Sequence, residues 1–384
     1  MARNPTVSRA SREDAATREK VAWLTDPQHY PGRPRAVEII ETHFAWVFLA
    51  GTRAYKLKKP LRQASMDYRT LERREHACRE ELRLNRRLAP DAYLRVLPLR
   101  RGRRGSLTLR RSSPTASRIV DWLVQMRRLE AARMLDRVIA AGDLRERDLD
   151  RIATRLASFF QRAERRPMSD GAYRARLRRE IRRNAQELCA PDLGLRGRRV
   201  VEVARAQIDF LARHPRELSG RGGRLIDGHG DLRPEHVFLG TTSAGVCVID
   251  CLEFDRDLRR LDPAEEIAFL ALECTRLGAA GAADGLIARY RGAAGDPVPR
   301  ALIHFYMSRR AALRAQISAW HLRDEEFAGE WREWKARAHS YLDDALRHAQ
   351  RAAAASGHVA PQLLEPCVGC RIRDLDPRRT DCDA

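Results

Sequence analysis

The chain has 384 residues, a formal net charge of +21 and 43% hydrophobic residues, which is enough apolar material for a folded core and excludes a wholly disordered chain. No apolar run approaches the ~18 residues that span a bilayer, and residues 1–20 contain no stretch that resembles a signal peptide. We therefore expect a cytoplasmic protein without a membrane partner, built as one large domain or as two lobes.

The positive charge is almost entirely arginine, because only five of the 73 basic residues are lysine. A basic chain attracts nucleic acid, anionic lipid and polyphosphate. The arginines are spread along the chain rather than grouped in blocks. The charge alone therefore does not establish a nucleic-acid partner, although it leaves one open.

The N-terminal third of the chain has the pattern of a small α+β unit. Residues 1–30 are polar and are predicted to form a flexible tail. Strand-type residues follow in VEIIETHFAWVFLAG and TRAYKLKK, with a turn at 50–53. A helix is expected at about 70–88, and YLRVLPL, SLTLRR and RIVDWLVQM predict three further strands. Residues 31–127 are thus expected to fold as one small unit.

From residue 128 the pattern is mainly helical. Helices are expected at about 129–140, 145–164, 171–189 and 199–213, and again from 263 to about 350. Between these groups a Gly-rich break, SGRGGR, precedes LIDGHGDLRPEHVFLG and then a short strand, VCVID. Residues 128–350 are predicted to be a mainly helical unit that includes these two segments, and residues 351–384 a flexible C-terminal tail.

Two carboxylates follow neighbouring short strands in this region. Asp231 follows the Gly-His-Gly turn after Leu225 and Ile226, and Asp250 ends VCVID nineteen residues later. We expect both to emerge on the same side of a small β-ribbon. One carboxylate that orients a hydroxyl, beside a second that holds a cation, suits phosphoryl transfer, in which the protein positions the acceptor and magnesium neutralises phosphate charge.

HGDLRPEHVFL followed by VIDCLEF resembles the catalytic and metal-binding loops of the aminoglycoside phosphotransferases. ETHFAWVFLAGTRAYKLKKP is similar to the first three strands of that family, and VQMRRL to its hinge. The resemblance covers about residues 36–320 and implies an α+β, protein-kinase-like fold with a small β-rich N-lobe and a larger helical C-lobe. It is closest to a subgroup that often carries a P-loop kinase domain, which we expect to be absent here because no GxxxxGK[ST] occurs.

The resemblance also implies roles for the residues of the two loops. Asp231 would be the base or the orienter of the acceptor hydroxyl, and His229 would brace its loop. Asp250 would bind the magnesium ion that bridges the nucleotide phosphates. Met126, in the hinge, is a candidate nucleotide-binding residue.

The family also uses a lysine on its third strand, which contacts the nucleotide phosphates and pairs with a helix glutamate. Lys56 best matches that lysine. Lys58 is the alternative, because side chains two apart share one face of a strand. Glu81 is the expected partner, with Glu80 close behind it. Thr42 is a weaker candidate for phosphate binding, since no GxGxxG precedes Lys56.

His236 stands where the family usually has an asparagine, five residues after the catalytic aspartate. Imidazole is a poor ligand for magnesium, which prefers oxygen. Three interpretations remain open: His236 lies behind the metal ligands or touches phosphate, it ligates a softer ion such as manganese, or the site has lost activity. Glu253 could supply a replacement oxygen.

The resemblance therefore implies a phosphotransferase that uses ATP or GTP with Mg²⁺ (or Mn²⁺) and acts on a hydroxyl of a small molecule. The alternative is a catalytically inactive kinase-like module that binds nucleotide or a partner. The sequence does not name the acceptor. A +21 protein repels polycationic aminoglycosides, yet residues 250–273 carry eight acids against three arginines, which would make a local acidic wall.

Overall fold

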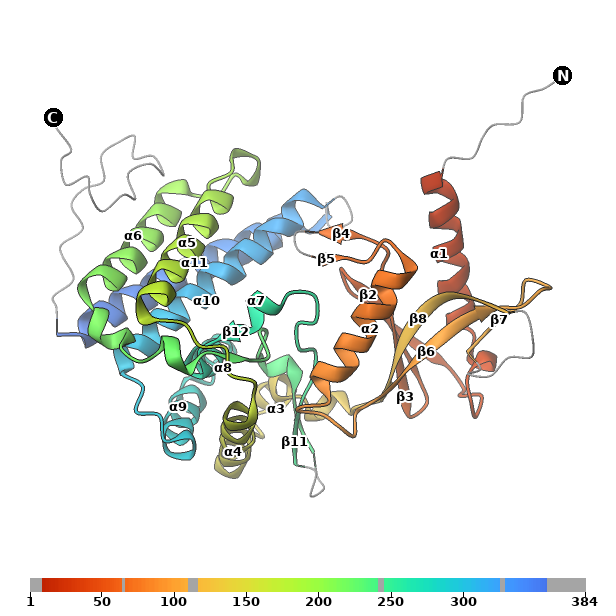
Figure 1. Ribbon diagram of the computed structural model, residues 1–384, viewed down its shortest axis with the longest axis horizontal. Coiled ribbons are helices and arrows are strands. Elements are labelled where there is room, and N and C mark those ends of the chain that lie inside the picture. The colour runs from red at the N-terminus through yellow and green to blue at the C-terminus, as the bar shows by residue number, and fades with distance from the viewer. Residues whose placement is uncertain (1–8, 64–65, 110–116, 241–244, 325–328, 358–384) are drawn as a thin grey trace. The chain divides into compact units, whose positions relative to one another are not determined.

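The structure, a computed structural model, describes residues 9–63, 66–109, 117–240, 245–324 and 329–357 (Figure 1). These residues fall into two compact units. The sheet unit comprises the described parts of 1–138 and 235–258, and the helical unit comprises those of 139–234 and 259–384. The boundary therefore differs from the one predicted at 127–128. The loop that carries Asp250, predicted to lie in the helical lobe, belongs by its contacts to the sheet unit.

The sheet unit is built on an antiparallel sheet of six strands in the order β1-β2-β3-β8-β6-β7. These strands are β1 (Val37–Glu41), β2 (Ala45–Ala50), β3 (Arg53–Lys58), β6 (Tyr93–Arg101), β7 (Leu107–Thr108) and β8 (Arg118–Arg127). The segment 37–58, in which two strands were predicted, forms three strands. The three strands predicted within 93–126 are confirmed. Gly51, at φ +59°, makes the tight turn between β2 and β3.

Strand β3 lies inside the sheet, with Lys56 opposite Val47 of β2 and Val124 of β8. Because side chains alternate along a strand, Lys56 and Lys58 share one face. Tyr55 and Leu57 point to the other face, where both are buried in the main core of this unit. The alternation that made the two lysines competing candidates is therefore confirmed.

Helix α1 (Arg9–Thr25) occupies most of the segment predicted to be a flexible tail through residue 30. That prediction is wrong here, because the helix packs into the core. Leu24 is fully buried beside Tyr55, and the Tyr30 hydroxyl donates to the Leu24 carbonyl oxygen at 2.5 Å. The polar surface of the segment hid this apolar contact from the sequence pattern.

Helix α2 (Leu71–Asn85) matches the helix expected at about 70–88. Thr70 caps its N-terminus, where the hydroxyl oxygen accepts a hydrogen bond from the Arg73 N–H. The buried face of the helix includes Glu81 and Asn85, one turn apart. A carboxylate and an amide buried on a helix face require polar partners, and the candidate site supplies them.

Two short hairpins complete the sheet unit. One joins β4 (Arg62–Gln63) to β5 (Met66–Asp67). The other joins β10 (Val237–Leu239) to β11 (Val246–Val248), in the two segments where the sequence predicted short strands. Cys247 and Ile249 pack against the buried cluster that includes Tyr93 and Val124. This packing explains why the β10–β11 loop belongs to the sheet unit.

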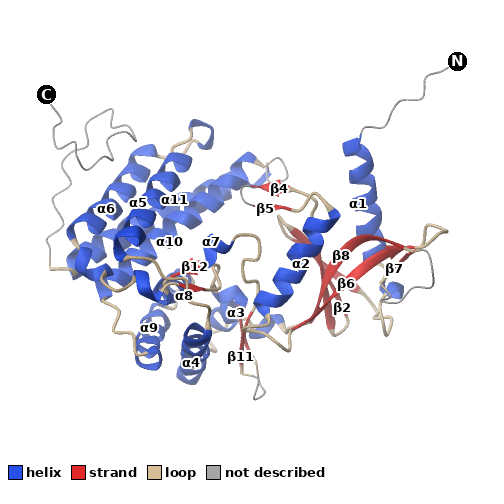
Figure 2. Ribbon diagram, in the orientation of Figure 1, coloured by secondary structure: helices blue, strands red, loops and turns tan. Residues whose placement is uncertain are grey.

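The helical unit consists mostly of long helices, whereas the sheet unit holds most of the strands (Figure 2). The longer helices that follow β8 are α3 (Leu135–Ala140), α4 (Glu146–Arg162), α5 (Asp170–Leu188), α6 (Gly197–Arg213), α8 (Pro263–Arg276), α9 (Ala280–Ala294), α10 (Arg300–Trp320) and α11 (Trp331–Ala355). These confirm the predicted helical pattern. Helix α11 extends past residue 350, and residues 358–384 of the predicted C-terminal tail lie outside the described residues. No helix in the described ranges combines the length and apolar composition that crossing a bilayer requires.

A two-residue ribbon lies beside the loop that holds Asp231. Strand β9 (Ile226–Asp227) pairs with β12 (Arg260–Leu261), which follows the short helix α7 (Arg256–Arg259). Asp262 then caps helix α8, where its side chain accepts a hydrogen bond from the Ala264 N–H. The helix therefore begins at Pro263, where the sequence predicted that the helical pattern resumes.

Candidate active site

Glu81 lies between two lysines. Its Oε1 is 3.0 Å from Lys56 Nζ and its Oε2 is 2.6 Å from Lys58 Nζ. The Glu81 side chain has no exposed surface, and the Lys58 side chain is only 2% exposed. One helix carboxylate thus pairs with both lysines that the sequence left as alternatives. Glu80, the other candidate, pairs instead with Arg83 on the helix surface.

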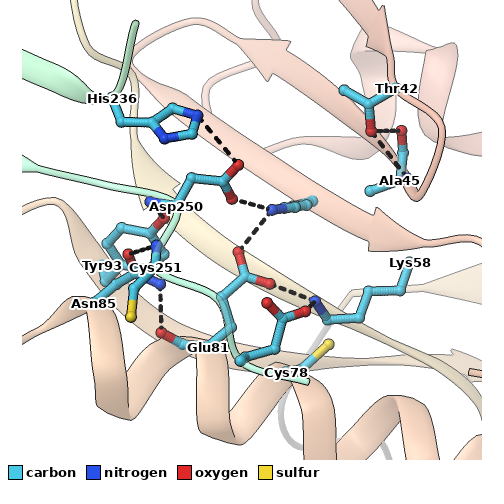
Figure 3. Close-up of polar contacts among 12 residues, drawn as sticks. Thr42, Ala45, Lys58, Cys78, Glu81, Asn85, Tyr93, His236, Asp250 and Cys251 are labelled. Carbon is cyan, nitrogen blue, oxygen red and sulfur yellow. Dashed lines mark hydrogen bonds and ion pairs between the residues drawn. The ribbon is translucent and has the colours of Figure 1, made fainter. Parts of the chain in front are cut away.

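Lys56 differs from Lys58 in what else it reaches. Its Nζ lies 2.6 Å from Asp250 Oδ1 and its side chain is 15% exposed. Figure 3 shows Asp250 between His236 and the Glu81 region, with Lys58 turned toward the other side of Glu81. Of the two lysines, Lys56 is therefore the one placed against the predicted metal ligand.

Lys58 is held by Glu81 and by the loop that follows Asp250. Its Nζ contacts Glu253 Oε1, and the Tyr68 hydroxyl donates to the same oxygen at 2.5 Å. Glu253 is the residue that could supply a replacement oxygen for an ion. In the structure, Glu253 Oε1 instead contacts Lys58 Nζ and accepts a hydrogen bond from the Tyr68 hydroxyl. Glu253 is therefore an ion-pair partner of Lys58.

The charges at Lys56 and Asp250 stabilise each other. Withdrawal from water would lower the pKa of Lys56, but Asp250 and Glu81 raise it well above its ordinary value. Withdrawal from water would raise the pKa of Asp250, but Lys56 and then His236 hold it well below its usual range. Both groups are therefore ionised at neutral pH. A cationic lysine and an anionic aspartate are the states that phosphate and metal binding require.

The backbone of Asp250 has a strained conformation that is held by side chains. Its φ is +62°, in the left-handed region that residues other than glycine seldom occupy. Its N–H donates to the Tyr93 hydroxyl at 3.2 Å, and the Cys251 N–H donates to Asn85 Oδ1 at 2.9 Å. Asn85 and Tyr93 were not singled out in the sequence, although Asn85 follows Glu81 by one helical turn and so shares its face.

His236 lies beside Asp250. The imidazole Nε2 is 3.7 Å from Asp250 Oδ2 and the residue is buried. The His236 carbonyl oxygen accepts a hydrogen bond from the Ile249 N–H at 2.9 Å, which fixes the two segments together. The position is therefore adjacent to the predicted metal ligand, as the interpretations of this residue require.

The remaining predicted nucleotide-binding residues lie elsewhere in the sheet unit. Thr42 is in the turn between β1 and β2, where its hydroxyl donates to the Ala45 carbonyl oxygen at 2.9 Å and accepts from the Ala45 N–H at 3.0 Å. Met126 lies near the end of β8, opposite Ala54 of β3. Thr42 thus has a turn-forming role that the sequence analysis did not weigh.

The loop that presents Asp231 lies in the helical unit and is braced from α8. Glu266 Oε1 accepts hydrogen bonds from the N–H groups of His229 and Gly230, at 2.7 and 2.8 Å. A Cβ on Gly228 would lie 2.4 Å from the same oxygen, so a side chain there would displace the Glu266 carboxylate from the loop. His229 is buried, and its Nδ1 is 3.3 Å from the Asp231 N–H, consistent with the predicted brace.

Glu266 itself was not singled out in the sequence, where it counted only among the eight acids of residues 250–273. Burial raises its pKa, although Arg310 and the two loop N–H groups oppose that shift. Arg310 also donates to the Gly230 carbonyl oxygen at 3.1 Å. The Asp231 carboxylate remains partly exposed and accepts a hydrogen bond from Arg233 Nε at 3.1 Å. The loop is thus fixed while its carboxylate stays accessible.

The acids of 250–273 do not make the acidic wall that the sequence suggested. Most of them are engaged within their own compact unit: Asp250 with Lys56, Glu253 with Lys58, Asp262 with Arg221, Glu265 with Arg310, Glu266 with the loop N–H groups, and Glu273 with the Tyr341 hydroxyl. These carboxylates therefore neutralise internal cations and satisfy internal donors.

A metal ion at this site would rely on few protein ligands. Within the described ranges no group of three or more His, Cys, Asp or Glu side chains is arranged to hold one. Mg²⁺ in phosphoryl-transfer sites is usually bound through one or two carboxylates together with phosphates and waters. The single Asp250 carboxylate fits that mode of binding, in which the nucleotide completes the coordination.

The sequence has relatives of unknown activity. It is 35% identical over 291 residues to uncharacterised proteins of Mycobacterium tuberculosis and Mycobacterium bovis, an alignment that covers 73% of this chain and 54% of each relative. The chain thus spans about half the length of the curated relatives it matches. No protein-family model matches the sequence.

Solved structures identify the fold. The GDP and kanamycin complex of the aminoglycoside phosphotransferase APH(2")-IIia superposes with a TM-score of 0.51 at 14% identity, covering 85% of this chain and 98% of that one. A choline/ethanolamine kinase family protein from Mesorhizobium loti has a TM-score of 0.46 at 15% identity, covering 88% and 99%. The first likeness confirms the α+β, protein-kinase-like fold that the sequence resemblance implied.

Proposed function

We propose that this chain is a small-molecule phosphotransferase that moves the γ-phosphoryl group of ATP or GTP to a hydroxyl. The observation that carries the proposal is the contact of Lys56 with both Glu81 and Asp250. A strand lysine that pairs with a helix glutamate beside a metal-type aspartate is the arrangement that kinases use on nucleotide phosphates. The fold shared with an enzyme solved with GDP and kanamycin supports the same assignment.

Asp250 would hold the divalent ion, because it presents a hard oxygen and its backbone is fixed by Tyr93 and Asn85. When bound, the ion would neutralise charge on the nucleotide phosphates. His236 next to Asp250 gives an imidazole where oxygen is usual, a donor that manganese accepts more readily than magnesium does. We therefore propose Mg²⁺ as the ion and Mn²⁺ as an alternative.

The chain's own groups would divide the work between charge and orientation. Lys56 places an ammonium group where it can pair with phosphate oxygens, while Glu81 keeps it extended along the sheet. Asp231 would orient the acceptor hydroxyl and take its proton on the carboxylate, because Glu266 and Arg310 hold its loop in place. In this assignment, none of the acidic residues within 250–273 binds the acceptor.

Nucleotide titration and product release test this function. Calorimetry with ATP or GTP, with and without magnesium, should show metal-dependent binding that Asp250→Ala abolishes. Release of ADP or GDP should then be screened against hydroxylated metabolites and antibiotics. Glu80→Gln is a matched control, since this acid lies on the surface of the same helix and pairs with Arg83 one turn away. A metal effect that survives in Asp250→Ala would contradict the assignment.

A catalytically inactive nucleotide-binding module is the second candidate, favoured by His236 in the position beside Asp250. It predicts tight nucleotide binding with no product release for any acceptor with either ion. The phosphotransferase predicts release with at least one acceptor. Measurement of both properties on the same protein separates the two functions.

A further inference from the structure

Asp121, in strand β8, is a buried carboxylate that joins two helices of the sheet unit. Lys20 Nζ of α1 lies 2.6 Å from Asp121 Oδ2, and Arg74 Nε of α2 lies 2.7 Å from Oδ1. The side chains of Lys20, Asp121 and Arg74 are 9%, 2% and 7% exposed. Asp121 therefore links α1 to the helix that carries Glu81.

Arg74 extends this network toward the candidate site. Its Nη1 donates to the Tyr68 carbonyl oxygen at 2.9 Å, and the Tyr68 hydroxyl donates to Glu253 at 2.5 Å. Glu253 in turn contacts Lys58. Arg74 and Glu81 also lie two turns apart on one buried face of α2, about 10 Å along its axis. A restraint on Arg74 therefore acts on both carboxylates that pair with Lys58.

Helix α1 also supports the strand that carries the two lysines. Leu24 packs with Tyr55 and Leu57, which lie on the opposite face of β3 from Lys56 and Lys58. The rings of Tyr30 and Tyr55 lie 4.8 Å apart. Helix α1 and the turn after it thus make two contacts: an apolar one with the face of β3 opposite the lysines, and an ionic one, through Lys20 and Asp121, with α2.

We propose that α1 is a positioning element for nucleotide binding, which acts through Lys20 and Asp121 on helix α2. It holds Glu81 at the depth where this carboxylate reaches both Lys56 and Lys58. None of the three groups in the Asp121 cluster touches the nucleotide in this scheme. The proposal rests on the proposed function for its effect on affinity, whereas its effect on α2 does not depend on that function.

Lys20→Met is a mild test variant, because it does not leave a buried charge without a partner. The Asp121 cluster contains two cations and one anion, so removal of Lys20 leaves a balanced Arg74–Asp121 pair. Lys20→Met keeps the length and the apolar part of the side chain, and the sheet unit should still fold. Lys20→Arg restores a cation. Glu19→Gln is the control, because this neighbouring residue of α1 is more exposed and its partner, Arg101, lies at the end of β6 and not on α2.

Hydrogen exchange across α2 is the first measurement, made without nucleotide. In Lys20→Met the amides of 71–85 should exchange at least 5-fold faster, with the helices of the helical unit unchanged. Glu19→Gln should match the wild type and Lys20→Arg should lie near it. Unchanged exchange in α2, or an equal rise in both units, would overturn the proposal.

Nucleotide affinity is the second measurement, made by calorimetry on the same variants. Lys20→Met should weaken binding about 10-fold and Lys20→Arg should recover most of it. Faster exchange in α2 with unchanged affinity for a nucleotide that the wild type binds would overturn the positioning role. If the wild type binds no nucleotide, the proposed function fails, and the exchange data still decide whether α1 restrains α2.

Discussion

Replacement by methionine should have different effects at Lys58 and at Lys56: mainly a loss of stability at Lys58 and mainly a loss of nucleotide affinity at Lys56. Lys58 is almost fully buried between Glu81 and Glu253, so Lys58→Met leaves two carboxylates with fewer partners in a dry site. Removal of one member of a buried ion pair typically costs about 3–5 kcal/mol. Lys56 is more exposed and faces Asp250, so Lys56→Met should cost less stability and more nucleotide affinity.

The loss in Lys58→Met should be partly recoverable, which makes its cause testable. Methionine at 58 removes one positive charge beside Glu81 and Glu253, and Glu253→Gln removes one of the two negative charges. The double variant should therefore be more stable than Lys58→Met alone, by about 1–2 kcal/mol if the two groups are coupled as contacting residues usually are.

Urea unfolding is the assay, followed by hydrogen exchange in the strands of the sheet unit, because the six tryptophans are divided between the two units and their fluorescence reports on both. Nucleotide affinity is measured alongside by calorimetry. Strictly additive effects of Lys58→Met and Glu253→Gln would refute the coupling. A larger loss of nucleotide affinity in Lys58→Met than in Lys56→Met would refute the assignment of the phosphate contact to Lys56.

Three further predictions concern other parts of the chain. Asp231→Asn should lower turnover ~100-fold or more with nucleotide affinity unchanged, as expected when a positioned base is removed, and a normal rate in steady-state assays would exclude this residue from the mechanism. His236→Asn should raise magnesium-supported turnover relative to manganese, which rates measured with each ion in both proteins will show; a loss with magnesium would mean that the imidazole itself binds phosphate or acceptor. Burial lowers the pKa of His304 to about 4 and of His348 to about 3, where their Nδ1 atoms meet at 3.1 Å. Because the unfolded chain takes up these protons near pH 6.5 and the folded chain does not, stability should fall as pH drops from about 6.5 toward 4, and His348→Phe should flatten that part of the urea-midpoint profile.

The sequence predicted the sheet unit well where a local pattern determines it. Alternation placed Lys56 and Lys58 on one strand face, and helical spacing placed Glu81 on the buried face of α2. What local pattern could not supply was the choice between the lysines. That choice depends on which of them reaches Asp250, a contact between residues 194 apart in the chain.

The features that the sequence did not predict, helix α1 and the role of Glu266, also depend on contacts between residues far apart in the chain. Helix α1 was taken for a tail because its docking depends on Leu24 and on a lysine that pairs with Asp121, about one hundred residues away. Glu266 was counted only among the acids of residues 250–273, since nothing in its spacing shows that it accepts hydrogen bonds from the loop before Asp231. Buried polar residues with distant partners are the class that a single sequence conceals.

The sharing of Glu81 between two lysines has a consequence for how the sheet unit can change state. A helix glutamate with one partner can swing outward and release that partner alone. Glu81 cannot do so, because any movement of α2 that withdraws it from Lys56 also withdraws it from Lys58. Lys56 would then keep Asp250 and Lys58 would keep Glu253, two balanced ion pairs. The two lysines should therefore lose their helix partner together while each keeps a carboxylate of the loop that follows β11.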